Sequence, residues 1–302
     1  MSIRLQLLLV ALTTLVLPWA GCQYARELES ALRDSQEKSL LASAATIANA
    51  LSAQPQRVFH ESSDAQAFSA SAGDLYVYPL LTQPLLDGYR DDWGISADPT
   101  PLPTATGYRA RLQAGSTERY LYLYAEVDDK HFEAQPNDAR PDQGRFDRVE
   151  LTLQGTDGTR SSYFFATSAP GLIAAQSVIK GDDGTPRVAV EPRIQAFWLQ
   201  TTTGYHLEAR IPLSFVGPHL WVEAIDGRGE GRSGIGPIAN PEGGRLFFTT
   251  AGLDALLLTF IRDGTRVTVI DTNALKLGSA GALTATPMGG TEDEGSTWYR
   301  FF

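Results

Sequence analysis

The chain has 302 residues, enough for one large domain or two modest ones once a hydrophobic N-terminal segment is set aside. With 43% hydrophobic and 20% charged residues, it can bury a substantial core. Its formal net charge of −10 argues against nucleic acid as a partner and favours a neutral or cationic ligand, or a divalent cation. The single cysteine, Cys22, permits no internal disulfide.

Residues 1–22 predict a transmembrane signal anchor. Arg4 precedes an apolar run from Leu5 to Ala20, which is close to the shortest length that spans a bilayer. On this interpretation Arg4 stays in the cytoplasm and residues 23–302 lie mostly on the other side of the membrane. Lipid attachment to Cys22 and cleavage of the segment remain alternatives, although Trp19 occupies a position where lipoproteins carry an aliphatic residue.

Residues 23–55 predict a stalk helix that continues from the anchor. No glycine or proline occurs before Pro55, and apolar side chains recur at Leu40, Ala44, Ile47 and Leu51 with helical spacing. The helix either packs on its own domain or acts as a membrane-proximal signalling helix that dimerises. A small polar linker, residues 56–73, follows it.

Residues 74–236 predict an antiparallel β-sandwich. About ten short runs rich in Val, Tyr, Phe, Leu and Ile follow one another, separated by turn signals such as Asp87-Gly88 and Asp182-Asp183-Gly184. The stretches between them are too short for the helices of a parallel α/β sheet.

Residues 237–290 predict a small α+β element. The stretch 250–264 reads as one helix, and "TRVTVID" and "ALKLGSAG" read as two strands. In the juxtamembrane segment 291–302, an acidic run gives way to aromatic residues and an arginine, a composition typical of membrane interfaces. We therefore expect a second membrane span beyond Phe302.

Candidate ligand-binding and metal-binding residues lie mainly in the sandwich. Asp87, Asp128 and Asp129 belong to two acidic clusters that offer hard oxygen ligands, so calcium is a possible cofactor; surface acids without a metal are the alternative. Trp198 and Trp221 lie on predicted strands, where each could stack on a ligand or belong to the core. The sequence lacks G-x-S-x-G and other catalytic motifs, which favours a non-catalytic chain.

Four motifs of the strand-rich region resemble the carbohydrate-binding module family 9-like sandwiches, in the order in which that family carries them. They are "PLLDGYRDDWG" (84–94), "YLYLYAEVDDKHF" (120–132), "FDRVELTL" (146–153) and "GYHLEARIPLSFVG" (204–217). We call them the first to fourth motif.

This resemblance implies a β-sandwich that binds carbohydrate. Asp147 and Glu150 in the third motif match acids that contact sugar hydroxyls or calcium in such modules. Sugar-binding members hold the sugar between two aromatic walls, whereas Gly144 or Arg145 stands at the first wall here. The stretch 222–241 has no tryptophan for the second.

The flanking segments resemble the sensor region of a bacterial sensor histidine kinase, most closely that of the proteobacterial dedicated sortase system. The matching stretches are the anchor with its helix and "DGTRVTVIDTNALKLGSAGAL" (263–283). The resemblance implies a homodimer in the bacterial inner membrane with a periplasmic sensor. Its ligand would come from the cell envelope, and a response regulator would bind a further cytoplasmic part. The alternative is a lipoprotein or secreted, non-catalytic carbohydrate-binding protein.

Overall fold

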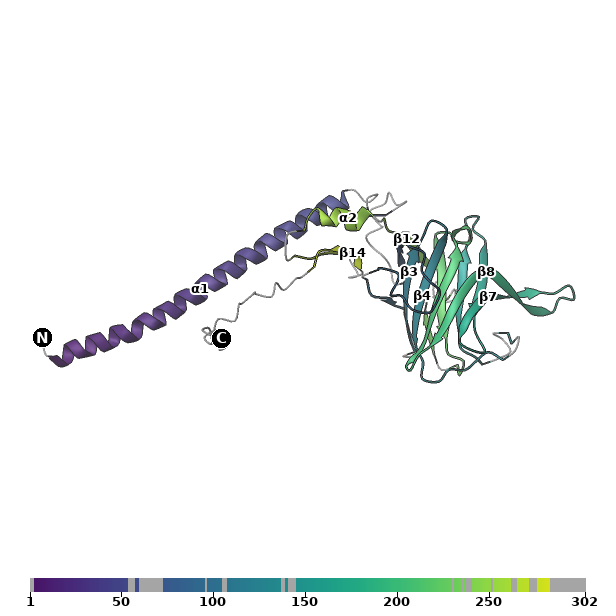
Figure 1. Ribbon diagram of the computed structural model, residues 1–302, viewed down its shortest axis with the longest axis horizontal. Helices are drawn as coiled ribbons and strands as arrows, with labels where there is room; N and C mark the ends of the chain where they lie inside the picture. The colour runs from purple at the N-terminus through teal and green to yellow at the C-terminus, as the bar shows by residue number, and fades with distance from the viewer. Residues whose placement is uncertain are drawn as a thin grey trace. The chain divides into compact units, whose positions relative to one another are not determined.

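The computed structural model divides into two compact units, residues 1–53 and 54–302 (Figure 1). It describes residues 3–53, 58–59, 73–95, 97–104, 108–136, 139–140, 145–229, 231–234, 236, 241–250, 252–261, 265–271 and 276–282. The juxtamembrane segment 291–302 and most of the 56–73 linker lie outside these residues.

The first unit is one helix, α1 (Ile3–Ser52), of 50 residues. The predicted anchor and stalk therefore form a single continuous helix. Its side chains from Ala20 to Thr46 are exposed, among them Leu28 and Leu32. Among the described residues, no helix has a stretch long and apolar enough to cross a bilayer.

The second unit is built on one 12-stranded sheet. Its strands are β1 (Leu75–Pro79), β2 (Thr100–Pro101), β3 (Arg109–Ser116), β4 (Tyr120–Asp128), β5 (Arg148–Gln154), β6 (Arg160–Phe165), β7 (Gly171–Lys180), β8 (Pro186–Gln200), β9 (Gly204–Pro212), β10 (His219–Ile225), β11 (Arg232–Gly234) and β12 (Gly244–Phe248). Their order is β1-β12-β10-β5-β6-β7-β8-β9-β4-β3-β2, with β11 paired to β10.

The sheet folds over a single main core, so the predicted β-sandwich is confirmed. Alternate residues of each strand face this core, as Val149, Leu151 and Leu153 of β5 do. Trp198 and Tyr205 stack beside one another with ring centroids 4.1 Å apart. The pleat thus gives an apolar inner face, and the outer face is covered on β4 by a second apolar cluster that contains Trp93, Tyr122 and Tyr124.

Two features of the sheet differ from the sequence prediction. First, β1 pairs in parallel with both β12 and β3, whereas the predicted sandwich had only antiparallel strands. The residues between β1 and β3 bring the chain back to the end from which β1 started, so both strands run in one direction. Second, β12 lies beyond residue 236, so the sheet reaches Phe248 rather than ending at the predicted boundary.

A buried glutamate ties a long surface loop to the sheet. Glu208 of β9 is fully buried, and its Oε2 accepts hydrogen bonds from the N–H groups of Asp87 and Gly88, both at 3.0 Å. Its Oε1 accepts the indole N–H of Trp93 at 2.9 Å. Trp93 packs edge-on against Tyr122 and Tyr124 of β4. One carboxylate therefore holds both ends of the first motif against the fourth.

The predicted C-terminal α+β element is present and is attached to β1. It comprises α2 (Gly252–Leu258), β13 (Val267–Ile270) and the antiparallel β14 (Lys276–Ala280). α2 is shorter than the predicted helix, because the chain tightens into i→i+3 hydrogen bonds after Leu258.

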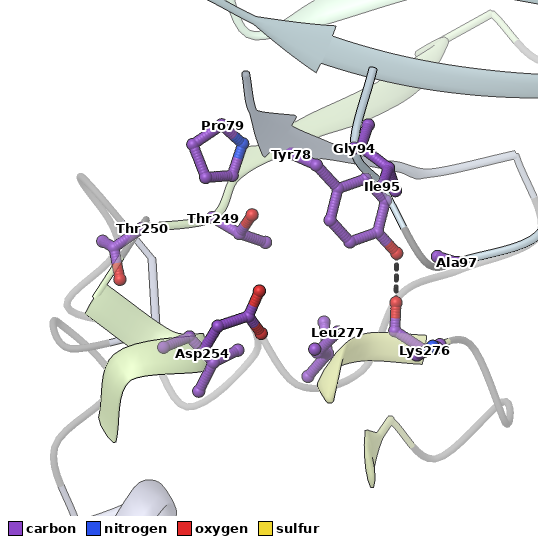
Figure 2. A pocket seen from close by; sticks show the side chains of 12 residues that line it. Tyr78, Pro79, Gly94, Ile95, Ala97, Thr249, Thr250, Asp254, Lys276 and Leu277 are labelled. Atoms are coloured by element: carbon purple, nitrogen blue, oxygen red, sulfur yellow. Dashed lines mark hydrogen bonds between the residues drawn. The ribbon is translucent and has the colours of Figure 1, made fainter. Parts of the chain in front are cut away.

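The attachment is made by two tyrosines of β1. The Tyr76 hydroxyl bonds Asp271 Oδ2 at 3.0 Å, and the Tyr78 hydroxyl donates to the carbonyl of Lys276. Figure 2 shows Tyr78 reaching Lys276 across a cavity of about 60 Å³, into which Asp254 also projects. The element is thus fixed to the edge of the sandwich by polar contacts around a small polar cavity.

Candidate metal centre

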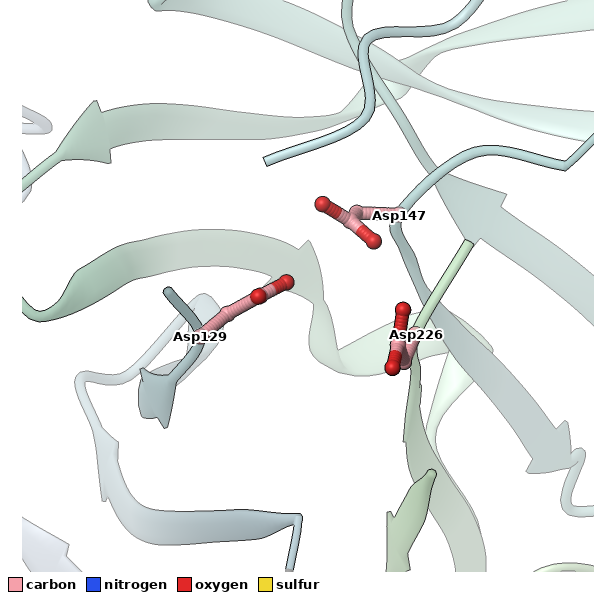
Figure 3. A group of neighbouring side chains, drawn as sticks. All are labelled: Asp129, Asp147 and Asp226. Carbon is pink, nitrogen blue, oxygen red and sulfur yellow. The ribbon is translucent and has the colours of Figure 1, made fainter. Parts of the chain in front are cut away.

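Three aspartates meet at one end of the sandwich (Figure 3). Asp129 directly follows β4, Asp147 directly precedes β5, and Asp226 directly follows β10. Each offers a carboxylate oxygen, and these oxygens all lie within 4.8 Å of one another. Strand ends that meet at one rim of the sandwich therefore bring together residues far apart in the sequence.

Backbone N–H groups hold each carboxylate in place. Asp129 Oδ1 accepts from the N–H of His131, and Asp226 Oδ1 accepts from the N–H of Arg228, both at 2.8 Å. Asp147 is fully buried; its Oδ1 accepts from Gly227 and its Oδ2 from Glu133, each at 2.7 Å. Asp147 thereby ties two loops to the start of β5.

One oxygen of the cluster has no hydrogen-bond donor. Asp129 Oδ2 is buried and has no partner among the described residues. An unpaired buried carboxylate oxygen costs free energy unless a proton or a cation satisfies it. The nearby Arg228 does not supply the charge, because its guanidinium pairs with Glu133 at 3.2 Å.

The electrostatics of the cluster also favour a cation. Burial, opposed by the N–H groups of Gly227 and Glu133 and assisted by the adjacent Asp129 carboxylate, raises the pKa of Asp147 to about 7. Three carboxylates whose mutual repulsion is relieved by a divalent cation are typical of calcium sites, which use six to eight oxygen ligands. The donor set therefore fits calcium.

Of the acids predicted to bind calcium, only Asp129 belongs to this cluster. Asp128 is exposed, because successive residues of a strand point to opposite sides. Asp87 lies in the first motif, where its Oδ1 accepts the N–H of Tyr89 at 2.9 Å and stabilises a turn. The two acidic clusters predicted from the sequence therefore contribute one member, Asp129, to the group of three aspartates.

Asp147 and Glu150 lie on opposite faces of β5 and do not form one ligand set. Asp147 points to the same side as the core residues Val149 and Leu151. Glu150 lies on the outer face, where its Oε1 accepts from Arg148 Nε at 2.8 Å. The Asp-x-x-Glu spacing places the two carboxylates on different faces because a strand alternates with period two.

Neither predicted tryptophan can stack on a ligand from its position here, and that prediction is corrected. Trp198 is 0% exposed and Trp221 is 1% exposed. The Arg160 guanidinium covers the ring of Trp221 at 4.3 Å. Phe146, beside the missing aromatic wall, is also fully buried. Large aromatic rings on the strands of a sandwich are more often part of the core than of a ligand-binding surface.

Asp226 was not predicted, although the sequence carried a signal for it. Asp226 opens the glycine-rich stretch "DGRGEGRSGIG", which begins with a tight turn that leads into β11. Asp226 N–H donates to Gly231 O at 3.1 Å, and Gly229 N–H donates to Asp226 O at 2.9 Å. An aspartate directly after a strand, as at Asp129, was the available clue.

Comparisons with known proteins bear on the backbone alone. No family model matches the chain, and no curated protein matches it. A carbohydrate-binding module of family 9 from Caldicellulosiruptor kristjanssonii, solved with cellotriose, aligns with a TM-score of 0.41 at 18% identity, over 60% of this chain and 96% of that one. The glucose complex from the same organism aligns with a TM-score of 0.39 at 17% identity, over 57% and 95%. These comparisons therefore do not identify binding residues in this chain.

The raised pKa of Asp147 predicts how stability depends on pH in the metal-free protein. A carboxyl group with a higher pKa in the folded chain contributes stability below its unfolded pKa, near 4, and that contribution is lost as pH rises through the folded pKa, about 7. With a chelator present, the wild-type chain should therefore lose stability relative to Asp147→Asn as the pH rises from about 4 to about 7.

Urea unfolding of both chains at several pH values measures this difference, with a slope of up to about 1.4 kcal/mol per pH unit within the window. A difference that does not change with pH would show that Asp147 ionises normally in the fold.

Proposed function

We propose that residues 73–250 form a non-catalytic carbohydrate-binding domain whose rim is held together by a divalent cation. The observation that carries the proposal is that the four motifs pack in two pairs, each around a buried carboxylate. Glu208 of the fourth motif holds the first motif. Asp147 of the third motif lies against Asp129 of the second. The family resemblance thus corresponds to a set of physical contacts.

The cation is assigned to Asp129, Asp147 and Asp226. A calcium ion there would satisfy Asp129 Oδ2 and neutralise the charge that burial makes unfavourable. Because the three residues end or begin three strands, the ion would join the loops after β4 and β10 to the start of β5. Its role in this proposal is to hold the rim in shape.

Calcium should stabilise the chain through this centre. A ligand that binds only the folded state at 100 times its Kd adds about 2.7 kcal/mol, which appears as a higher melting temperature. Asp129→Asn and Asp226→Asn should each abolish the increase. Asp128→Asn is the matched control, because the neighbouring carboxylate is exposed and outside the cluster, and it should respond as wild type does. An increase that survives Asp129→Asn would contradict the assignment.

Carbohydrate binding is tested with a panel of soluble trisaccharides. Isothermal titration of the full chain, with calcium present, against cellotriose, maltotriose and chitotriose should show binding of at least one. Chromatography of the sugar after prolonged incubation should recover it intact, since the proposal includes no catalysis. The absence of binding to any glycan, in a chain whose melting temperature shows that it is folded, would contradict the proposed function.

A second candidate function is that of the sensor region of a membrane-bound histidine kinase. The observation that favours it is the pair of tyrosines on β1. Tyr76 and Tyr78 join the sandwich to the α+β element through Asp271 and Lys276. A change in the sandwich would pass directly to that element, as signalling across a membrane requires. The cell-envelope ligand, the homodimer and the response regulator that the resemblance implies are all parts of this candidate function.

Cys22 provides a probe for the dimer of this second candidate. It is the single cysteine of the chain, and it is exposed on α1. Two parallel copies of α1 would bring both Cys22 thiols within disulfide range. Mild oxidation should then give a covalent dimer that Cys22→Ser abolishes. A chain that stays monomeric under oxidation would count against the sensor candidate and leave the carbohydrate-binding proposal unaffected.

A further inference from the structure

A cavity of about 580 Å³ opens where β12 separates from β10, and we call it the wedge. The two strands pair only at His219↔Arg245 and Leu220↔Gly244. Beyond that point, β12 continues beside β1, and just after β12 an isolated antiparallel bridge joins Thr249 to Phe59. The wedge is lined by Phe59, Thr156, Leu213, Val216, Gly217, Pro218, His219, Arg245, Leu246, Phe247 and Phe248.

Two hydrogen bonds, one of which requires a glycine, keep the wedge open. The Val216 N–H, which would otherwise face β12, donates to Leu213 O within the 3₁₀ turn η3 (Leu213–Phe215). Gly217 N–H donates to Gln154 O at 2.7 Å, which draws the segment towards β5. A side chain at Gly217 would lie 2.4 Å from that oxygen, so only glycine permits the approach.

The open edge of β12 presents one acceptor and one donor to the wedge. Leu246 N–H donates to Pro218 O at 2.9 Å, but Pro218 has no N–H to return the bond to the Leu246 carbonyl. Thr250 N–H donates on the same side, to Val58 O at 2.9 Å. Because N–H groups alternate along a strand, that of Phe248 also faces this side.

The side chains of the wedge are mostly apolar and carry no unbalanced charge. Arg245 is neutralised by the buried Asp74, whose Oδ2 accepts from its Nη2 at 2.7 Å. His219 Nδ1 lies 3.0 Å from Gln154 Oε1, and it donates this hydrogen bond in the Nδ1–H tautomer. In the neutral ring, Nε2 is then an acceptor.

We propose that the wedge binds one uncharged sugar residue, an inference that rests on the proposed carbohydrate-binding function. Vicinal hydroxyls both donate and accept, so one hydroxyl donates to the Leu246 carbonyl while its neighbour accepts from Phe248 N–H. A third donates to His219 Nε2. The apolar C–H face of the ring packs on Leu213 and the phenylalanine side chains. The volume lies within the range of small-ligand sites.

The closed ends of the wedge favour a sugar over an extended peptide. An added strand would continue along β12 in both directions. Pro218 blocks this edge at Leu246, and Val58 blocks it at Thr250. A ligand that needs only one donor and one acceptor from the strand fits between them.

The test is titration of the folded full chain, with calcium present, against cellotriose, maltotriose and chitotriose, with trigalacturonate as the anionic control. Leu213→Trp fills the wedge and should weaken the neutral trisaccharide by more than about tenfold, and His219→Ala should weaken it by up to about tenfold. Leu81→Trp is the matched control at a 92% exposed position, and it should bind as wild type does. In the wild-type chain, the sugar should also shift the NMR signal of the Phe248 amide.

Each other outcome has a defined meaning. A trisaccharide that binds wild type and Leu213→Trp equally, without shifting the Phe248 amide, overturns the wedge and leaves the carbohydrate-binding proposal standing. No binding of any sugar to the wild-type chain overturns both. Tighter binding of trigalacturonate overturns the uncharged-ligand assignment. An extended apolar peptide that shifts the Phe248 amide when no sugar does would assign the wedge to peptides.

Discussion

The fold of the sandwich depends on the buried carboxylate of Glu208 and its three N–H donors. Burial raises the pKa of Glu208, while the hydrogen bonds from Trp93, Gly88 and Asp87 oppose the rise. Such a group is tolerated only where each oxygen is satisfied. Without it, the N–H groups of Asp87 and Gly88 would lose their acceptor, and the indole N–H of Trp93 would lose its partner. Asp147 is a second buried carboxylate of this kind at the rim, where its oxygens accept N–H groups from two further loops.

The two carboxylates explain why sequence motifs so far apart belong together. In the first and fourth motifs, the aspartate-glycine pair and the tryptophan supply donors, and the glutamate accepts from them. In the second and third motifs, Asp129 and Asp147 converge on a common centre with Asp226. The motifs thus correspond to a framework that holds loops, and the buried carboxylates of that framework are separate from the aromatic walls of sugar-binding modules. The loops are therefore held to the sheet even though the sequence lacks the aromatic walls.

Strand identity and the sandwich could be predicted from the sequence, because alternation and turn residues are local signals. The pairing of β1 with β12 could not, since it joins residues about 170 positions apart and depends on the path of the intervening chain. The same limit applied to the site: Asp129 and Asp147 were identified separately, but their convergence with Asp226 requires the three-dimensional rim. Trp198 and Trp221 were ambiguous because large rings on a strand suit a core and a ligand face equally well. The wedge could not be predicted from the sequence, because two of the three polar groups assigned to the sugar belong to the backbone of β12.

The central claim is that buried carboxylates hold the loops of this domain to its sheet. Urea unfolding of Glu208→Gln tests it most directly, because glutamine keeps the volume but places an NH₂ group against N–H donors. The account predicts a loss of about 1–3 kcal/mol in unfolding free energy, whereas Glu118→Gln, at an exposed position, should change it by less than about 0.5 kcal/mol. Equal stability of Glu208→Gln and the wild-type chain would contradict the account.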